Sequence, residues 1–246
     1  MRSALLLCVC IVLRSLVLAQ TATSAGGARI EILNADRWDH DPSKAGGAQR
    51  LIGNVRFKHA DAIMHCDSAY LHEDQTMEAF GNVGIDQGDS LHITGKRLVY
   101  SGRDRIATIT DQVRLNDPGM ELTTDELTYS VRERTARYAT GATIVSQRDG
   151  NRLTSRKGAY LAATRKFIFS DQVHLQHPER TIDADTLHYT TTTGVAEFFG
   201  PTRITQGSTV MFCDRGAYDT RHEHGRFTRN GRIVDGGQEL RGDSLH

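Results

Sequence analysis

The chain of 246 residues carries 30 Lys and Arg against 30 Asp and Glu, so its formal net charge is zero. This balance argues against a nucleic-acid-binding protein held by a general basic field and against a polybasic protein of membrane surfaces. An apolar share of 38%, 23 glycines and a single Trp fit a repetitive β-structure with a thin, continuous core better than a compact α/β enzyme.

The first twenty residues have the pattern of a cleavable signal peptide. A charged start at Arg2 precedes an apolar run, and Val17 and Ala19 fit the small-residue rule, so we expect cleavage before Gln20. The run is too short to span a membrane and an arginine interrupts it, although an uncleaved N-terminal anchor is the alternative. The predicted organisation is a signal peptide at 1–19, a flexible leader at 20–29 and one repeat domain at 30–246.

A repeat of about thirty residues runs through the rest of the chain. Its template is an apolar residue, any residue, a small residue, Asp and, four residues after the Asp, Tyr, as in the segment from Ile182 to Tyr189. Spacings of 29 or 31 residues separate the apolar lead residues, which are Leu33, Met64, Ile93, Leu122, Leu153, Ile182, Met211 and Leu240. Such a period is typical of stacked units that each bury an apolar face against the next.

Two further elements keep the same period. Gly or Asp turns open segments that alternate apolar and polar residues, as in 53–57 and 171–175, which predicts a strand with one buried face. A short strand precedes each of these turns, as at 77–80, and polar segments such as 101–104 and 191–194 are predicted hairpin loops. Since no segment has a helical period, the predicted fold class is all-β, a solenoid-like stack of two facing antiparallel sheets.

The repeated aspartates are interpreted as structural, because a catalytic site is usually unique whereas these residues recur with the architecture. We expect each one at a bend or bulge, where its carboxylate accepts backbone N–H bonds. The aspartates are Asp36, Asp67, Asp125, Asp185, Asp214 and Asp243.

No other motif predicts catalysis. Cys66 and Cys213 hold the same template position five repeats apart, roughly 24 Å at about 4.8 Å per strand, so we predict no disulfide between them. His222-Glu223-His224 is a weak metal candidate in a predicted hairpin turn. We therefore expect neither an enzyme nor a bound metal or cofactor. An apolar interior open at its ends could hold acyl chains, and its unpaired strand edges favour head-to-tail pairing.

The motif of Ile182 to Leu187, alternating with Gly-Asn-Val units at Gly53 and Gly81, resembles the OstA-like/LptA periplasmic proteins. The resemblance covers about residues 30–246 and implies a twisted, open β-jellyroll whose groove carries lipopolysaccharide between the inner and outer membranes. It also implies edge-to-edge contacts with a jellyroll partner of the inner-membrane transporter complex and with the outer-membrane translocon, with a head-to-tail homo-oligomer as a further possibility. By position, the implied lipid-binding residues are Met64, Val83, Ile85, Ile93, Val113, Leu115, Leu122, Leu153, Val173, Leu175, Ile182 and Met211.

Alternatives stay open at this point. The chain is longer than a minimal bridge protein and ends inside a repeat, so the periplasmic part of a larger translocon-like protein is also consistent with the sequence. A structural or adhesive exported β-solenoid with a dry core would need no lipid. A polysaccharide-active β-helix enzyme would need a non-repeating carboxylate cluster, and the sequence has none that we recognise. The width of the interior distinguishes a lipopolysaccharide-transport protein from a structural solenoid with a dry core.

Overall fold

The computed structural model describes residues 29–41, 43, 47–89, 91–147, 150–222 and 224–245. The predicted signal peptide and nearly all of the predicted leader therefore lie outside the described residues. The described residues form strands, turns and bends only, which confirms the all-β prediction. This part of the chain contains no helix that could cross a membrane.

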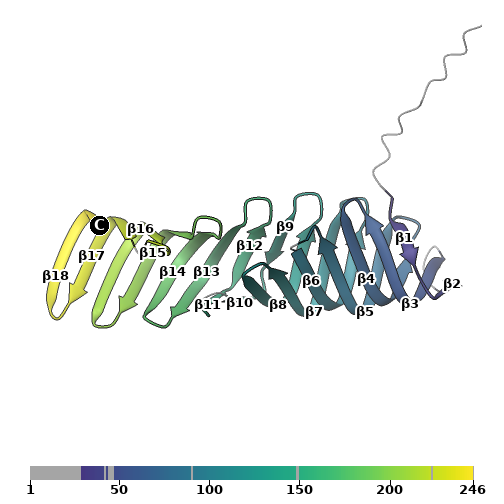
Figure 1. The fold of residues 1–246 in the computed structure, drawn as a ribbon, viewed down its shortest axis with the longest axis horizontal. Helices are drawn as coiled ribbons and strands as arrows, with labels where there is room; N and C mark the ends of the chain where they lie inside the picture. Colours follow the sequence, from purple (N-terminus) through teal and green to yellow (C-terminus); the bar gives the residue numbers. More distant parts are fainter. Residues whose placement is uncertain are drawn as a thin grey trace, which may run out of the picture.

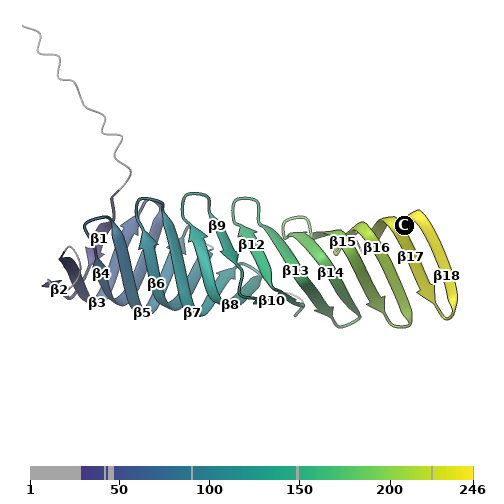
Figure 2. The same cartoon turned by 180° about the vertical axis from the view of Figure 1, so that it is seen from behind.

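Eighteen antiparallel strands form one sheet that is drawn out into a long stack (Figures 1 and 2). The first strands lie at one end of the stack and β18 lies at the other. The strands are β1 (Glu31–Asn34), β2 (Arg37–Asp41), β3 (Ala48–His59), β4 (Ala62–Leu71), β5 (Thr76–Gln87), β6 (Leu91–Ser101), β7 (Ile106–Asp117), β8 (Met120–Ser130), β9 (Thr135–Tyr138), β10 (Ala142–Ser146), β11 (Arg152–Ser155), β12 (Lys157–Leu161), β13 (Lys166–His177), β14 (Arg180–Thr190), β15 (Val195–Gln206), β16 (Thr209–Asp219), β17 (His224–Asp235) and β18 (Gln238–Leu245).

Each long strand changes register near its middle, and this break divides the sheet into two layers that are joined through the strands themselves. The predicted facing sheets are therefore the two halves of one continuous sheet. Layer A contains 37–41, 48–52, 68–71, 76–80, 97–101, 106–110, 126–130, 135–138, 157–161, 166–170, 186–190, 195–199, 215–219, 224–228 and 244–245. Layer B contains 31–34, 55–59, 62–66, 83–87, 91–95, 113–117, 120–124, 142–146, 152–155, 173–177, 180–184, 202–206, 209–213, 231–235 and 238–242.

The register breaks at a β-bulge in every second long strand, namely β3, β5, β7, β13, β15 and β17. In β5, Gly81 and Asn82 together oppose Lys96 alone, with φ angles of 72° and 41°. Two consecutive left-handed residues bend a strand without reversing it. The Gly and Asp segments that were predicted to turn the chain between separate strands therefore lie inside single strands, with the exception of Gly141, which does lie between two strands. The predicted turn is right at Gly141 and wrong at the other positions.

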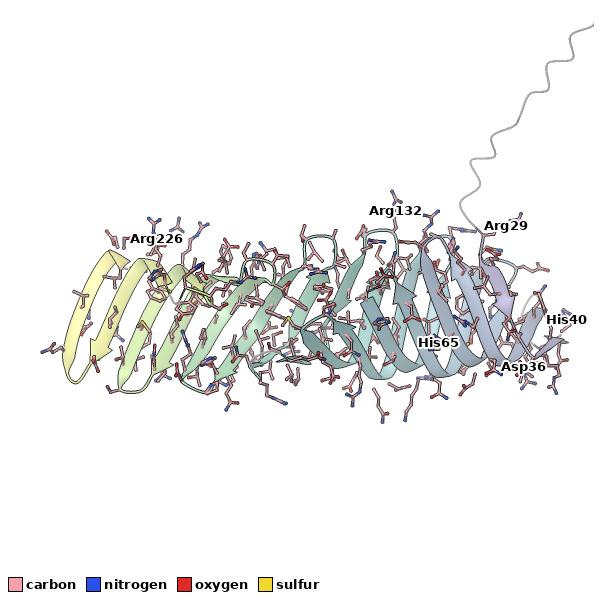
Figure 3. All side chains as sticks on the ribbon, in the orientation of Figure 1. Arg29, Asp36, His40, His65, Arg132 and Arg226 are labelled. Carbon is pink, nitrogen blue, oxygen red and sulfur yellow. The ribbon has the colours of Figure 1, made fainter. Side chains whose placement is uncertain are left out.

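The repeated aspartates lie beside these bulges, as predicted, but their carboxylates have different partners. Asp67 accepts hydrogen bonds from the side-chain amide of Asn82 at 2.9 and 3.1 Å, and Asp36 accepts one from Asn54 at 2.8 Å. Figure 3 labels Asp36 near the β1 and β2 end of the stack. At Asp36, Asp67 and Asp214 an asparagine side chain thus takes the place of the expected backbone donor, because the left-handed asparagine carries its amide across to the neighbouring strand.

Gly81→Ala is predicted to lower the free energy of unfolding by about 1–3 kcal/mol, since alanine is strained at a φ of +72° and its Cβ would lie 2.3 Å from the Asp67 carboxylate. Gly88→Ala is the matched control, because its φ is +65° but no atom lies within 4 Å of the added Cβ. Urea titrations should show the smaller loss for the control. Equal losses would mean that the Asp67 contact adds nothing to the backbone strain.

Four short strands replace two long ones in the middle of the stack. Strands β9 and β12 continue layer A between β8 and β13, while β10 and β11 continue layer B. Gly141, which lies between β9 and β10, has a φ of 93° and belongs to no strand. Hydrogen bonding is continuous along each layer here, but no unbroken strand runs from one layer to the other.

The interior between the layers is the core of the protein. Cys66 in β4 and Cys213 in β16 are both buried and free, as the repeat spacing predicts. Burial raises the pKa of the Cys66 thiol to about 12 and that of Cys213 to about 11, so neither is a reactive thiolate at neutral pH.

Candidate ligand-binding groove

Buried hydrogen bonds join the rims of the two layers in the first half of the stack. The Nδ1 atom of His59 lies 2.5 Å from the hydroxyl of Tyr100, and Tyr129 donates to the Oε1 atom of Gln87. Each tyrosine ends a strand of layer A, and its partner ends a strand of layer B. Such pairs hold the two rims together above the core.

The third bond of this kind lies closest to the middle of the stack. The hydroxyl of Tyr160 donates to the Oδ2 atom of Asp117 at 2.5 Å. The bonded residues are 41, 42 and 43 positions apart in the sequence. Because this separation is nearly constant, the same pair of positions recurs in successive repeats. We call these three pairs the tyrosine ladder.

The ladder is dry, and its tyrosines are strongly perturbed. Tyr100, Tyr129 and Tyr160 are each no more than 1% exposed. Burial raises the pKa of all three hydroxyls far above their ordinary value, and the bond to Asp117 raises that of Tyr160 further. These groups therefore remain neutral hydrogen-bond donors or acceptors at physiological pH.

The ladder ends at Tyr160, although the tyrosine position of the repeat continues to Tyr189 and Tyr218. Both later tyrosines are half-buried, and their hydroxyls make no hydrogen bond within the described part of the chain. By the same spacings their partners would be Ser146 and His177. Serine is too short to span the rims, and His177 accepts a bond from the backbone N–H of Glu179 at 3.1 Å instead.

A groove opens between the layers where the ladder ends. Its larger part is a cavity of about 740 Å³, and a smaller cavity of about 300 Å³ lies further toward β18, with Arg180 and Tyr218 lining both. The larger cavity is lined by Pro118, Gly119, Met120, Ile144, Ser146, Asn151, Leu153, Phe169, Leu175, His177, Arg180, Ile182, Leu187, Tyr189, Thr191, Ala196, Tyr218, Thr220 and Arg221. The smaller one is lined by Glu179, Arg180, Gln206, Met211, Tyr218, Gly225, Phe227, Ile233 and Leu245. We call the two cavities together the open groove.

The structure separates the predicted lipid-binding residues into two sets. Leu153, Leu175 and Ile182 line the larger cavity, and Met211 lines the smaller one. The other eight are at most 2% exposed and line neither cavity: Met64, Val83, Ile85, Ile93, Val113, Leu115, Leu122 and Val173. A ligand could therefore reach the first four without disrupting the core.

Several residues of the groove were not anticipated from the sequence. Phe169, Leu187 and Ala196 extend its apolar wall from layer A, and Tyr189 and Tyr218 stand at its mouth. The repeated Tyr was recognised as a template position, but its hydrogen-bond partner varies among His59, Gln87 and Asp117. In the series of partner positions, the residue that follows Asp117 is Ser146, which is short. This loss of a long polar side chain is a sequence signal that could have located the groove.

Outside the groove, three further hollows of the described residues, of about 510, 660 and 1280 Å³, lie along the bulges. The largest of them is on the solvent-facing side, where polar and charged residues such as Thr94, Lys96 and Arg156 line it. No group of three or more His, Cys, Asp or Glu residues among the described residues could hold a metal ion. The ring of His222 instead bonds Asp219 at 2.9 Å. Figure 3 labels Arg132 and Arg226, which lie along the same long side of the stack.

Tyr129→Phe is predicted to lower the free energy of unfolding by about 1–3 kcal/mol, because it leaves the buried Oε1 atom of Gln87 without its donor. Tyr189→Phe removes a hydroxyl at the same template position that has no such bond, so it should change stability by less than about 0.5 kcal/mol. Chemical denaturation of both variants checks this difference. If the two substitutions cost the same, the tyrosine ladder does not stabilise the closed half.

Comparison with known proteins gives a matching family and similar solved structures. The model of a family described as OstA-like protein matches residues 27–185, well over half of the chain. A search of curated proteins finds no match. Among solved structures, the chain is similar to LptH from Pseudomonas aeruginosa, described as the LptA homologous periplasmic component of the conserved lipopolysaccharide transport device. The identity is 10% and the TM-score 0.27, over 61% of this chain and 93% of that chain.

Proposed function

The chain belongs to the OstA-like family, and from that premise we propose that it transports lipopolysaccharide, holding the acyl chains in the open groove. The observation that carries the proposal is the end of the tyrosine ladder at Tyr160, beyond which a cavity of about 740 Å³ opens between the layers. Its lining combines apolar side chains with polar and cationic ones, as an amphiphilic ligand requires.

The two halves of the stack have different parts in this proposal. The closed half, from β3 to β8, has a filled core and serves as a rigid spacer. The open half, from β10 to β18, offers Leu175, Ile182 and Met211 to acyl chains, and these residues are the proposed binding set together with Leu153. Transport requires binding and release only, so we propose that the protein is not an enzyme.

The ends of the stack support a role as a bridge between partners. Among the described residues β18 pairs with β17 and with no other strand, and strand edges of this kind can pair with a partner. Large apolar side chains are exposed at both ends, with Trp38 56% and Leu240 57% exposed. We propose that these edges pair with jellyroll partners of the inner-membrane transporter complex and the outer-membrane translocon, in the periplasm, after cleavage before Gln20.

A structural β-solenoid with a dry core is the second candidate, and the closed half is what favours it. Its core residues are almost completely buried, with Met64 and Ile85 at 0% exposure. The open groove does not fit that candidate, because apolar surface that is open to solvent is unfavourable in a protein that binds no ligand there.

Binding of labelled lipopolysaccharide to the mature chain tests the proposal. We expect saturable binding that unlabelled lipopolysaccharide displaces and that deacylated lipopolysaccharide of the same saccharide does not. Displacement by the deacylated saccharide would mean that sugars are recognised in place of acyl chains. A lack of any binding would favour the structural solenoid.

A further inference from the structure

One arginine in the open groove has no partner that explains its position. Arg180 is the first residue of β14, and its guanidinium carbon lies 4.7 Å from the centre of the Tyr218 ring. Its Nε atom is buried and makes no hydrogen bond to any described residue. A buried donor of a charged group that lacks an acceptor is costly, and such an atom in a native protein calls for a specific explanation.

The charges around Arg180 favour an anion. The described lining of the larger cavity holds two arginines and one histidine, Arg180, Arg221 and His177, and no Asp or Glu. Glu179 lines the smaller cavity, but it forms no ion pair with Arg180 within 4.0 Å. Asp219, at the end of β16, is already paired with His222, which holds the pKa of Asp219 down at about 2.

The neighbouring Arg221 and His177 have donors free to bind a ligand. Arg221 uses one Nη atom on the backbone oxygens of Thr191 and Thr192, at 3.4 and 2.7 Å, and retains further N–H groups. His177 accepts a bond at Nδ1, so in its neutral form the proton lies on Nε2, which is then a donor. The contact with the Tyr218 ring holds the guanidinium between the two cavities, and a guanidinium can bind an oxyanion through two N–H groups.

We propose that Arg180 binds a phosphate group carried by the amphiphile whose acyl chains occupy the open groove. The inference rests on the proposed function and adds a headgroup subsite to it. The apolar walls at Leu175 and Ile182 take the acyl chains, while Arg180 takes the phosphate between the two cavities. Arg221 and His177 add positive charge or donors at the same mouth.

Affinities of the mature chain for phosphorylated lipid A, for dephosphorylated lipid A with the same acyl chains and for inorganic phosphate test the proposal. Arg180→Gln should weaken binding of the phosphorylated lipid by about tenfold or more and leave the dephosphorylated lipid within about twofold. Arg180→Lys should recover part of the loss, because it restores charge without the planar fork. The matched control is Arg203→Gln, on the exposed face of the adjacent strand β15.

Each other outcome has its own meaning. If wild-type protein binds both lipids equally and Arg180→Gln changes neither, lipid transport stands and the phosphate subsite is wrong. If Arg180→Gln abolishes binding of inorganic phosphate but not of the phosphorylated lipid, the site serves the free ion and the headgroup assignment is wrong. If wild-type protein binds neither lipid, the proposed function itself fails.

The stability of the variant gives a readout that separates ligand binding from a structural role. Removal of an unpartnered buried donor should leave the thermal midpoint of the unliganded Arg180→Gln protein unchanged or raise it. A clear fall in the midpoint, together with equal loss of affinity for both lipids, would mean that Arg180 shapes the groove without binding phosphate.

Discussion

Leu175→Asp is expected to weaken lipopolysaccharide binding by about tenfold or more while the protein remains folded, whereas Leu115→Asp is expected to unfold it. The two leucines hold the same place in the repeat, at the ends of Asp111–Leu115 and Asp171–Leu175. Leu115 is 1% exposed in the closed half, so a carboxylate there would be buried without a partner, at a cost of about 4 kcal/mol or more. Leu175 is half-buried in the wall of the groove, where water can reach a carboxylate.

Circular dichroism and lipid-binding measurements on both variants check this pair. We expect native secondary structure and poor binding for Leu175→Asp, and loss of structure for Leu115→Asp. A folded Leu115→Asp protein would mean that the first half of the stack is not a closed core. A Leu175→Asp protein with wild-type affinity would remove this residue from the binding set.

The protein is expected to unfold cooperatively as the pH rises above 10. Tyrosine in an unfolded chain has a pKa of about 10, while burial raises the pKa of Tyr138 to about 12 and those of the three ladder tyrosines further. A raised folded-state pKa contributes stability that is complete below the unfolded pKa and is lost as the pH climbs toward the folded one. For Tyr138 alone, two pKa units correspond to about 2–3 kcal/mol.

Tyrosinate absorbance and circular dichroism should therefore change together in one alkaline transition. The four buried hydroxyls belong to one core, so ionising any of them favours the unfolded chain, in which all of them ionise. Tyr138→Phe should move the midpoint of the alkaline transition to higher pH. The substitution also removes the hydrogen bond to Ser155, and the free energy of unfolding at neutral pH measures that separate loss. A gradual titration near pH 10 with the strands intact would show that the tyrosines are accessible to solvent.

The repeat made much of the fold predictable, because one alternating pattern recurs in each unit. From the lead position of the repeat, Ile93 and Ile182 were predicted to face the interior, and both are buried. From the repeat spacing, Cys66 and Cys213 were predicted to form no disulfide, and both are free. The mid-strand bulges were harder to predict. A Gly-Asn pair also forms tight turns in isolation, and only pairing on both sides keeps Gly81 and Asn82 inside one strand.

The location of the groove could not be predicted from the same pattern. All twelve candidate residues occupy equivalent apolar positions, so the repeat itself does not distinguish the closed half from the open one. The difference comes from contacts between rims 41 to 43 residues apart, made by His59, Gln87 and Asp117. These three side chains share only the ability to reach a tyrosine hydroxyl, which Ser146 lacks.

Photocrosslinking in cells from Ile93 and Ile182 tests the central claim most directly, since both are lead residues of the same template on opposite sides of the end of the ladder. With a photoreactive residue at each position, and Arg103 on an exposed turn as the surface control, we predict a lipopolysaccharide crosslink from Ile182 and none from Ile93 or Arg103. Crosslinks of equal yield from Ile93 and Ile182, or a crosslink from Arg103 alone, would contradict the account.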